Sequence, residues 1–187
     1  MGKMIVISAP SGSGKTTIVK QVLAADLNLA FSVSACSRAP RQGEVDGRDY
    51  YFLTPETFRQ KIDAADFIEW EEVYPGSYYG TLRCEVERIW SQGRHVIFDV
   101  DVLGGLNIKQ QYGAKCLAIF IKVPSVAELE KRLRLRATDD EPTISKRMRK
   151  VDYEMSFAPQ FDAIVVNENL STAVGETRQI ILDFLNT

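Results

Sequence analysis

Residues 8–17, near the N-terminus, have the types and spacing of a phosphate-binding loop and read SAPSGSGKTT. Gly12 and Gly14 let the backbone turn so that its N–H groups point at a phosphate chain. Lys15 would supply a mobile positive charge for that chain, and the Thr16 hydroxyl could bind Mg²⁺. The residues predicted to line this site are Ala9, Pro10, Ser11, Gly12, Ser13, Gly14, Lys15, Thr16 and Thr17.

The flanking residues fit such a loop. An apolar run, residues 4–7, precedes it, and apolar residues at i, i+4 spacing follow it in residues 18–23. This order of strand, glycine-rich loop and helix is what a P-loop requires. Ala9 stands where the usual pattern begins with glycine, which is acceptable if its φ is negative. The alternative is a Gly/Ser turn that carries a lysine by chance.

Two further groups of polar residues follow predicted strands. Arg38 and Arg41 come soon after residues 29–34, where open α/β sheets place their ligands, and paired arginines suit phosphate. A solvated loop is the alternative. Asp99 and Asp101 end the strand 95–101 and share one face of it. They could serve a nucleotide site or accept hydrogen bonds from loop N–H groups.

The elements that position these residues alternate along the chain. Strands are predicted at residues 4–7, 29–34, 95–101, 115–123 and 163–167, with helices after the phosphate loop, at 103–112, from 124–125 to 133, and at 170–185. This alternation predicts an α/β fold with a parallel sheet and helices on both faces. Residues 35–85 contain shorter strands, at 50–54, 67–73 and 78–81, with helices at 55–64 and 82–90. We interpret them as a small α+β insert.

Composition excludes several functional classes. The chain has 187 residues, enough for one domain, and 23 basic against 25 acidic residues, so no charge excess favours nucleic acid or an anionic membrane. Three scattered cysteines fit neither a disulfide framework nor a metal site and favour a reducing, cytoplasmic location. We see no leader peptide and no apolar run of about 20 residues, the length of a membrane span. The sequence leaves the oligomeric state open.

Several separated motifs, taken in order, resemble the guanylate kinase family across nearly the whole chain. They are the phosphate loop, FSVS at 31–34, RAPRQGE at 38–44, DYYF at 49–52, FIEW at 67–70, YYGT at 78–81, DVD at 99–101 with Gly104, and the late arginines. The resemblance implies transfer of the γ-phosphoryl group of ATP to GMP, and by extension to dGMP, with Mg²⁺ bound at Thr16. It implies a P-loop core (1–34 and 86–187), a GMP-binding insert (35–85) and a lid (133–150).

The resemblance also assigns roles to individual residues. GMP contacts are implied at Ser34, Arg38, Arg41, Glu44, Tyr50, Glu69, Tyr79, Thr81, Asp99 and Asp101. Catalytic roles are implied for Lys15, Arg38, Arg132, Arg136 and Arg147, the last three being lid arginines around the sequence DDEP at 139–142. A solvated basic face is the alternative for the late arginines. Asn167 matches a loop on the adenine side.

Guanine carries N1–H and N2–H₂ donors on one edge, and a single carboxylate can accept both. Glu69 is the matching carboxylate, although an exposed position on a strand is the alternative. Leu103 stands before Gly104 where family members often carry Gln, so no water-orienting role is expected there. Two other functions stay open: an inactive, protein-binding relative, and a P-loop kinase for another phosphorylated acceptor.

Overall fold

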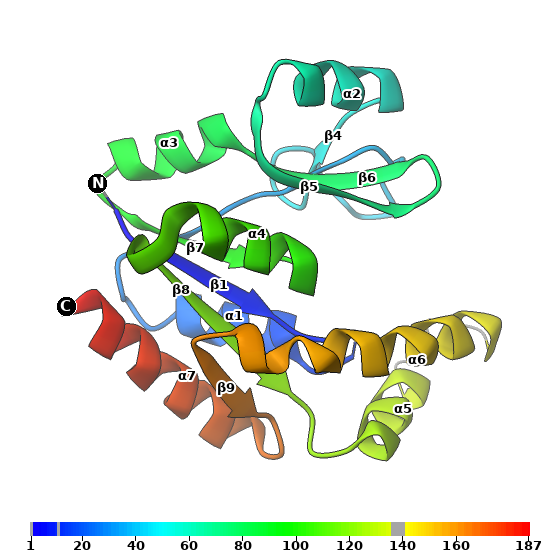
Figure 1. Ribbon diagram of the computed structural model, residues 1–187, viewed down its shortest axis with the longest axis vertical. Helices are drawn as coiled ribbons and strands as arrows, with labels where there is room; N and C mark the ends of the chain where they lie inside the picture. Colours follow the sequence, from blue (N-terminus) through cyan, green and yellow to red (C-terminus); the bar gives the residue numbers. More distant parts are fainter. Residues whose placement is uncertain (1, 11, 136–140) are drawn as a thin grey trace. The chain divides into compact units, whose positions relative to one another are not determined.

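The computed structural model describes residues 2–10, 12–135 and 141–187. Five strands form one sheet: β1 (Met4–Ser8), β2 (Leu29–Phe31), β7 (His95–Asp99), β8 (Cys116–Lys122) and β9 (Ala163–Val166). Their order is β2-β7-β1-β8-β9, and the β2–β7 and β8–β9 pairs are parallel (Figure 1). β1 is buried along its whole length, as expected for a central strand with both faces covered. The predicted α/β fold with a parallel core is confirmed.

The chain separates into two compact units. Unit 1 contains the chain up to Met4 and residues 28–98, and unit 2 contains residues 5–27 and 99–187. The boundaries therefore run through β1 and follow the penultimate residue of β7. The predicted division into a core (1–34 and 86–187), an insert (35–85) and a lid (133–150) has other limits and stays a prediction.

Unit 1 holds a second sheet with the order β4-β3-β6-β5. Its strands are β3 (Ala35–Cys36), β4 (Tyr51–Phe52), β5 (Phe67–Tyr74) and β6 (Ser77–Leu82). β5 and β6 form an antiparallel hairpin, and Gly76 at its turn has a φ of 75°. This unit also contains the helices α2 (Pro55–Asp63) and α3 (Arg83–Ser91).

Helix α2 supplies the apolar core of this second sheet. Thr54 caps its N-terminus, and the side-chain oxygen of Thr54 accepts a hydrogen bond from the Thr57 N–H. Phe58 is fully buried, and its ring stacks on those of Phe67 (4.4 Å) and Tyr78 (5.5 Å). The sheet is thereby held on one side by an aromatic cluster.

One prediction in this region is wrong. The stretch 29–34 is not one strand, because β2 ends at Phe31 and β3 begins at Ala35 in the other sheet. β3 also pairs in parallel with β4, so the second sheet is not made of hairpins alone. A strand of two residues is too short to show an alternating pattern, which is why the sequence did not reveal it.

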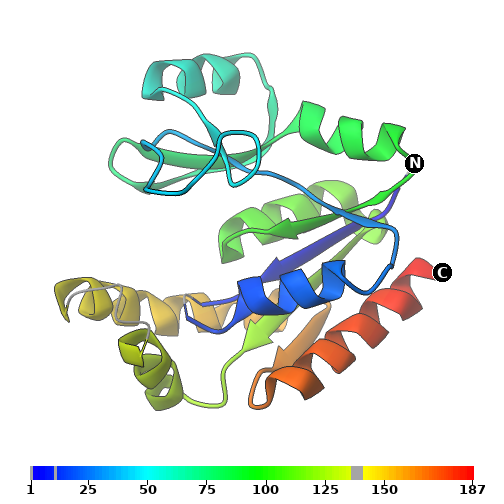
Figure 2. The same ribbon diagram turned by 180° about the vertical axis from the view of Figure 1, so that it is seen from behind.

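Unit 2 surrounds its strands with five α-helices among the described residues. They are α1 (Lys15–Leu23), α4 (Val102–Tyr112), α5 (Val126–Leu135), α6 (Glu141–Ser156) and α7 (Leu170–Leu185), with 3₁₀ turns at Gly113–Lys115 and Ala158–Gln160. Figure 1 looks onto α4 and α6, and Figure 2, from behind, looks onto α1 and α7, which contact each other. Helices therefore cover both faces, as predicted. No helix in the described part of the chain has the length and hydrophobicity to cross a membrane.

Candidate functional site

The loop after β1 has the backbone geometry that anion binding requires. Gly12 and Gly14 have φ values of 93° and 90°, a region that favours glycine. Gly14 caps α1 without a side-chain hydrogen bond, and the first turn of α1 carries no acidic residue that would compete with a phosphate for its N–H groups. Ala9 is absent from the described non-glycine residues with positive φ. The condition for replacing glycine at position 9 is therefore met.

Lys15 and Thr16 meet one carboxylate. The Lys15 ammonium lies 2.7 Å from Asp99 Oδ1 and donates to the Val100 carbonyl at 2.7 Å. The Thr16 hydroxyl donates to Asp99 Oδ2 at 3.0 Å. The resemblance implies a GMP contact for Asp99, which stays a prediction, and the structure places its carboxylate beside the phosphate loop. The described residues contain no group of three or more His, Cys, Asp or Glu side chains suited to a metal.

Asn167, at the end of β9, contacts the phosphate loop. Its buried side-chain amide donates to the Ser13 carbonyl at 2.7 Å. A Cβ on Gly14 would lie 2.5 Å from the same nitrogen, so this position needs glycine for space as well as for its φ. Asn167 therefore braces the backbone of the loop, and its predicted place beside adenine stays a prediction.

Asp101 is a helix cap. Its Oδ1 accepts a hydrogen bond from the Gly104 N–H at 2.8 Å, and its carbonyl accepts one from the Ser8 hydroxyl at 2.9 Å. The sequence had left this structural role open as the alternative. The predicted contact with the acceptor nucleoside stays a prediction.

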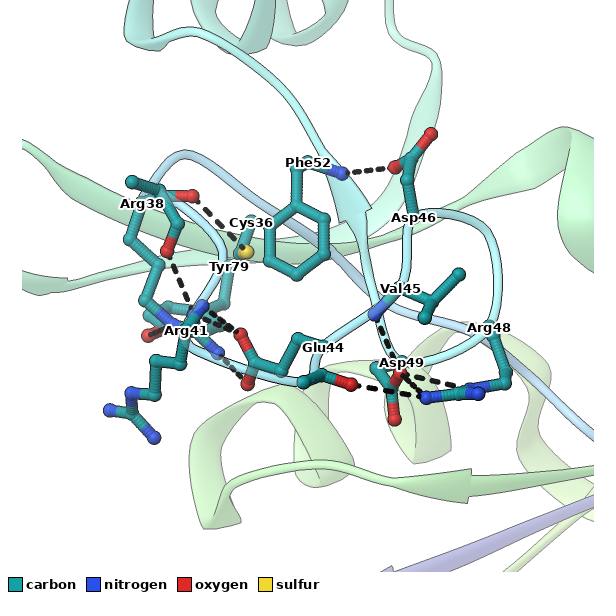
Figure 3. Close-up of polar contacts among 12 residues, drawn as sticks. Cys36, Arg38, Arg41, Glu44, Val45, Asp46, Arg48, Asp49, Phe52 and Tyr79 are labelled. Atoms are coloured by element: carbon teal, nitrogen blue, oxygen red, sulfur yellow. Dashed lines mark hydrogen bonds and ion pairs between the residues drawn. The ribbon is translucent and has the colours of Figure 1, made fainter.

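The arginine-rich loop of unit 1 forms a tight ionic cluster (Figure 3). Arg38 donates from both terminal nitrogens to the Glu44 carboxylate, at 2.6 and 2.7 Å, and from Nε to the Tyr79 hydroxyl at 3.1 Å. Its guanidinium lies over the rings of Tyr50 (5.0 Å) and Phe52 (5.6 Å). Arg38, Glu44, Tyr50 and Tyr79, separated by up to 41 residues in the chain, thereby lie together, and their predicted contact with GMP stays a prediction.

Electrostatics keep this cluster charged. The hydrogen bond from Arg38, followed by one from the Arg41 N–H at 2.7 Å, lowers the pKa of Glu44 to about 2. The same carboxylate raises the pKa of Arg38 above its usual value. The Arg41 side chain is exposed and extends away from Glu44 in Figure 3. Arg41 thus differs from Arg38, whose fork is already occupied.

Glu69 and Thr81 form a buried pair on the neighbouring strands β5 and β6. The two residues are aligned in register, and the Thr81 hydroxyl donates to Glu69 Oε1 at 2.7 Å. Glu69 is only 8% exposed, which excludes the solvated strand position considered as the alternative. Ser34, which immediately precedes β3, is half-buried, and its carbonyl accepts a hydrogen bond from the Tyr51 N–H at 2.9 Å.

The sequence analysis missed one buried acid, Glu85, at 2% exposure on α3. It accepts hydrogen bonds from the Val33 N–H, the Tyr51 hydroxyl and Arg88. Burial alone would raise the pKa of Glu85, but these hydrogen bonds outweigh it and the pKa is lowered. Its spacing of four from the buried Ile89 was the available signal, because it puts Glu85 on the apolar face of the helix.

The lid region is only partly described. Ser11 and Arg136 lie outside the described residues, as do Asp139 and Asp140, and the side chains of Arg132 and Arg147 are likewise not described. Arg134 is half-exposed and pairs with Glu130 at 2.9 Å and with Glu141. The three predicted lid arginines stay predictions.

Comparison with known proteins gives one consistent family. A family model described as guanylate kinase matches residues 1–183. The guanylate kinase of Porphyromonas gingivalis is 52% identical over 186 residues, covering 99% of each chain. That of Bacteroides thetaiotaomicron is 52% identical over 185 residues, covering 99% of this chain and 91% of the relative. The crystal structure of guanylate kinase from Anaplasma phagocytophilum matches with a TM-score of 0.78 at 28% identity, covering 97% of this chain and 85% of that one.

Proposed function

The chain belongs to the guanylate kinase family, enzymes that transfer the γ-phosphoryl group of ATP to GMP, and from this premise we propose which of its residues bind each substrate. The core binds ATP through residues 9–17 and Asn167. The insert binds GMP, and by extension dGMP, through Ser34, Arg38, Arg41, Glu44, Tyr50, Glu69, Tyr79 and Thr81. Asp99 and Asp101 of the core are also proposed as GMP contacts. The lid arginines are Arg132, Arg136 and Arg147.

Lys15 and the start of α1 offer hydrogen-bond donors for a triphosphate. Two of the three N–H groups of the Lys15 ammonium are used by Asp99 and Val100, which leaves one for a phosphate oxygen. The N–H groups at the start of α1 add further donors. This donor set supports the proposal that ATP binds at residues 9–17.

The oxygen ligands beside the loop suit magnesium. The Thr16 hydroxyl and the Asp99 carboxylate are hard oxygen donors 3.0 Å apart, and Mg²⁺ in phosphoryl-transfer sites takes few protein ligands, with waters and phosphates as the rest. We place Thr16 as the direct ligand and Asp99 as the residue that orients a bound water. When bound, Mg²⁺ neutralises charge on the β- and γ-phosphates.

The acceptor phosphate is bound by the cluster around Arg38. Glu44 holds one edge of the Arg38 guanidinium, so the phosphate approaches the side on which Tyr79 lies. The Tyr50 and Tyr79 hydroxyls can donate to it, and the exposed Arg41 side chain is available to turn toward it. Glu44 therefore acts on GMP through Arg38, by fixing the orientation of its guanidinium.

The guanine base is selected by Glu69. Its carboxylate can accept from guanine N1–H and N2–H₂, and Thr81 fixes its orientation. Adenine lacks this pair of donors, so AMP could not make the two hydrogen bonds to this carboxylate that guanine makes, a difference of about 1–3 kcal/mol. This buried pair is the observation that carries the assignment of GMP as acceptor.

The chemistry requires no general base. The phosphate oxygen of GMP is already anionic near neutral pH, so the site must align the acceptor with the γ-phosphorus and neutralise charge. Lys15 and the three lid arginines supply that positive charge. Exclusion of water prevents hydrolysis of ATP in place of transfer.

Two substitutions, each expected to affect only one substrate, test the assignment of ATP to the phosphate loop and of guanine to Glu69. Lys15→Ala should abolish turnover while the Kd for GMP stays within about twofold of the unmodified value, because the lysine acts on ATP alone. Glu69→Gln should raise the KM for GMP by about tenfold or more, with the KM for ATP unchanged, because its amide N–H₂ then faces a guanine donor.

Lys20→Ala is the matched control for the first substitution, since Lys20 is exposed on the same helix. Turnover and GMP titration calorimetry of the folded variants provide the measurements. Near-normal turnover of Lys15→Ala would refute the ATP site, and unchanged GMP binding in Glu69→Gln would move the base site elsewhere.

A further inference from the structure

The buried carboxylate of Glu85 uses all of its acceptor capacity within unit 1. Oε1 accepts from the Val33 N–H at 3.2 Å and from an Arg88 terminal nitrogen at 2.8 Å. Oε2 accepts from the Tyr51 hydroxyl at 3.0 Å and from Arg88 Nε at 2.9 Å. A carboxylate has about four acceptor positions, and four donors fill them. Glu85 is therefore not placed to bind a substrate itself.

The groups that Glu85 holds lie next to two residues of the proposed acceptor site. Val33 precedes Ser34, and Tyr51 follows Tyr50. The two segments also join directly, because the Tyr51 N–H donates to the Ser34 carbonyl at 2.9 Å. Glu85 on α3 is thus hydrogen-bonded to the segment before β3 and to β4, which are also hydrogen-bonded to each other.

The geometry of β4 explains how this reaches the acceptor. Successive side chains of a strand point to opposite faces. Tyr51 points toward Glu85 and packs against the aromatic core of the second sheet. Phe52 on β4 and Tyr50, which immediately precedes β4, contact Arg38 instead, with their rings 5.6 and 5.0 Å from the guanidinium. Tyr50 and Tyr51 are adjacent in the chain. The hydrogen bond that holds the Tyr51 side chain therefore also restricts the position of Tyr50 beside Arg38.

We propose that Glu85 is a positioning residue for the acceptor nucleotide, which sets Ser34 and Tyr50 by holding the neighbouring Val33 and Tyr51. This inference rests on the proposed function, since it takes Ser34 and Tyr50 to contact GMP. Because the ATP loop lies in unit 2 and makes none of these contacts, the effect of Glu85 is confined to GMP.

Two variants and one control test the proposal. Glu85→Gln keeps the size of the side chain but presents an amide N–H₂ to two donors. Tyr51→Phe removes a single hydroxyl and leaves the Ser34 contact, which is made by backbone. Each should raise the KM and the Kd for GMP, by about fivefold or more for Glu85→Gln and about threefold for Tyr51→Phe, with the KM for ATP unchanged. Glu87 is exposed on the same helix, and Glu87→Gln should leave the KM and Kd for GMP and the KM for ATP unchanged.

The double variant supplies the decisive readout. Both substitutions break the same contact. The loss of GMP binding free energy in the double variant should therefore be smaller than the sum of the losses in the two single variants. Loss of thermal stability with unchanged GMP and ATP constants would overturn the proposal and leave Glu85 a purely structural residue. If Glu85→Gln does not fold, Tyr51→Phe decides alone. Failure of the unmodified protein to bind GMP would refute the proposed function, whereas normal binding with unaffected variants would refute only the role of Glu85.

Discussion

At the scale of single residues, the phosphate loop is built from residues that are neighbours in the chain. Gly12, Gly14, Lys15 and Thr16 are close in the chain, and the backbone needs only the left-handed φ values found at the glycines. The support behind the loop comes from a residue that is distant in the chain. Asn167 lies 154 residues from Ser13, and the hydrogen bond that joins them depends on the whole of unit 2 being folded.

Removal of the Asn167 side chain is predicted to weaken ATP binding. Asn167→Ala loses the hydrogen bond to the Ser13 carbonyl and leaves that buried acceptor without its partner, at a cost of about 1–3 kcal/mol. The KM for ATP should rise by about tenfold, since about 1.4 kcal/mol is a tenfold change in affinity. The KM for GMP should stay the same. Steady-state kinetics with each substrate varied in turn measures this, and a KM for ATP like that of the unmodified protein would contradict the bracing role.

The sequence alone did not distinguish the two buried acids of unit 1, Glu69, which is proposed to bind guanine, and Glu85, which holds neighbouring segments of the chain. Glu69 was found through its place in a family motif, and without that motif an exposed strand position was the simpler interpretation. Glu85 has no motif, and only its spacing from Ile89 marks it as facing inward. Which donors meet a buried carboxylate is decided by residues distant in the chain, here Val33 and Tyr51.

At the scale of elements, the strands and helices with clear periodicity were predicted well. β7, α4, β8, β9 and α7 lie where the pattern placed them, with ends that differ by a few residues. β3 escaped because it is two residues long and is defined by its partners β4 and β6. Burial of β8 along six of its seven residues explains its continuous apolar run.

Two glycines in helices give a matched test of this packing. A Cβ on Gly105 in α4 would lie 2.5 Å from Ser8 Oγ and 2.8 Å from Val6 Cγ1, so α4 approaches β1 closely. Gly105→Ala should destabilise the protein by about 1–3 kcal/mol, because this core has no room. Gly175→Ala in α7 meets open space and should stabilise it by about 0.5–1 kcal/mol through helix propensity.

Urea unfolding of the two variants beside the unmodified protein measures both changes. Equal effects of the same sign would show that the close approach of α4 to β1 does not govern stability. The Gly105 variant should also lower turnover, since the Ser8 hydroxyl that it displaces donates to the Asp101 carbonyl beside the site.

At the scale of the whole molecule, the charge balance bears on partners and on pH. The net charge of −2 comes from nearly equal numbers of acids and bases, so phosphate binding depends on local clusters such as that around Arg38. The sole histidine, His95, accepts a hydrogen bond from the Lys3 N–H at Nδ1, 2.9 Å away. Burial, followed by the charge of Lys3, lowers the pKa of His95.

This lowered pKa predicts a loss of stability in mild acid. The unfolded chain binds the histidine proton near its ordinary pKa of about 6.5, whereas the folded chain resists it to lower pH. The free energy of unfolding should therefore fall as pH drops below about 6.5 and should level off below the folded pKa. Glu44 contributes only in stronger acid, because its stabilising charge is lost as pH falls toward about 2.

Urea unfolding at pH 7.5 and 5.5 measures this contribution. His95→Asn, which keeps an acceptor near Nδ1 but does not titrate, should show a smaller decline over that range than the unmodified protein. Identical declines would mean that His95 is protonated equally in both states.

The most direct test of the account is ADP release from ATP and Mg²⁺ with GMP, AMP, CMP and UMP offered in turn to the unmodified protein. We predict rapid ADP formation with GMP and none above background with the other three, because only guanine supplies both donors for the buried Glu69 carboxylate. Turnover with another nucleotide would keep the phosphate loop and contradict the guanine site. The absence of turnover with all four, in a folded protein that still binds GMP, would contradict the catalytic assignment and favour a binding role.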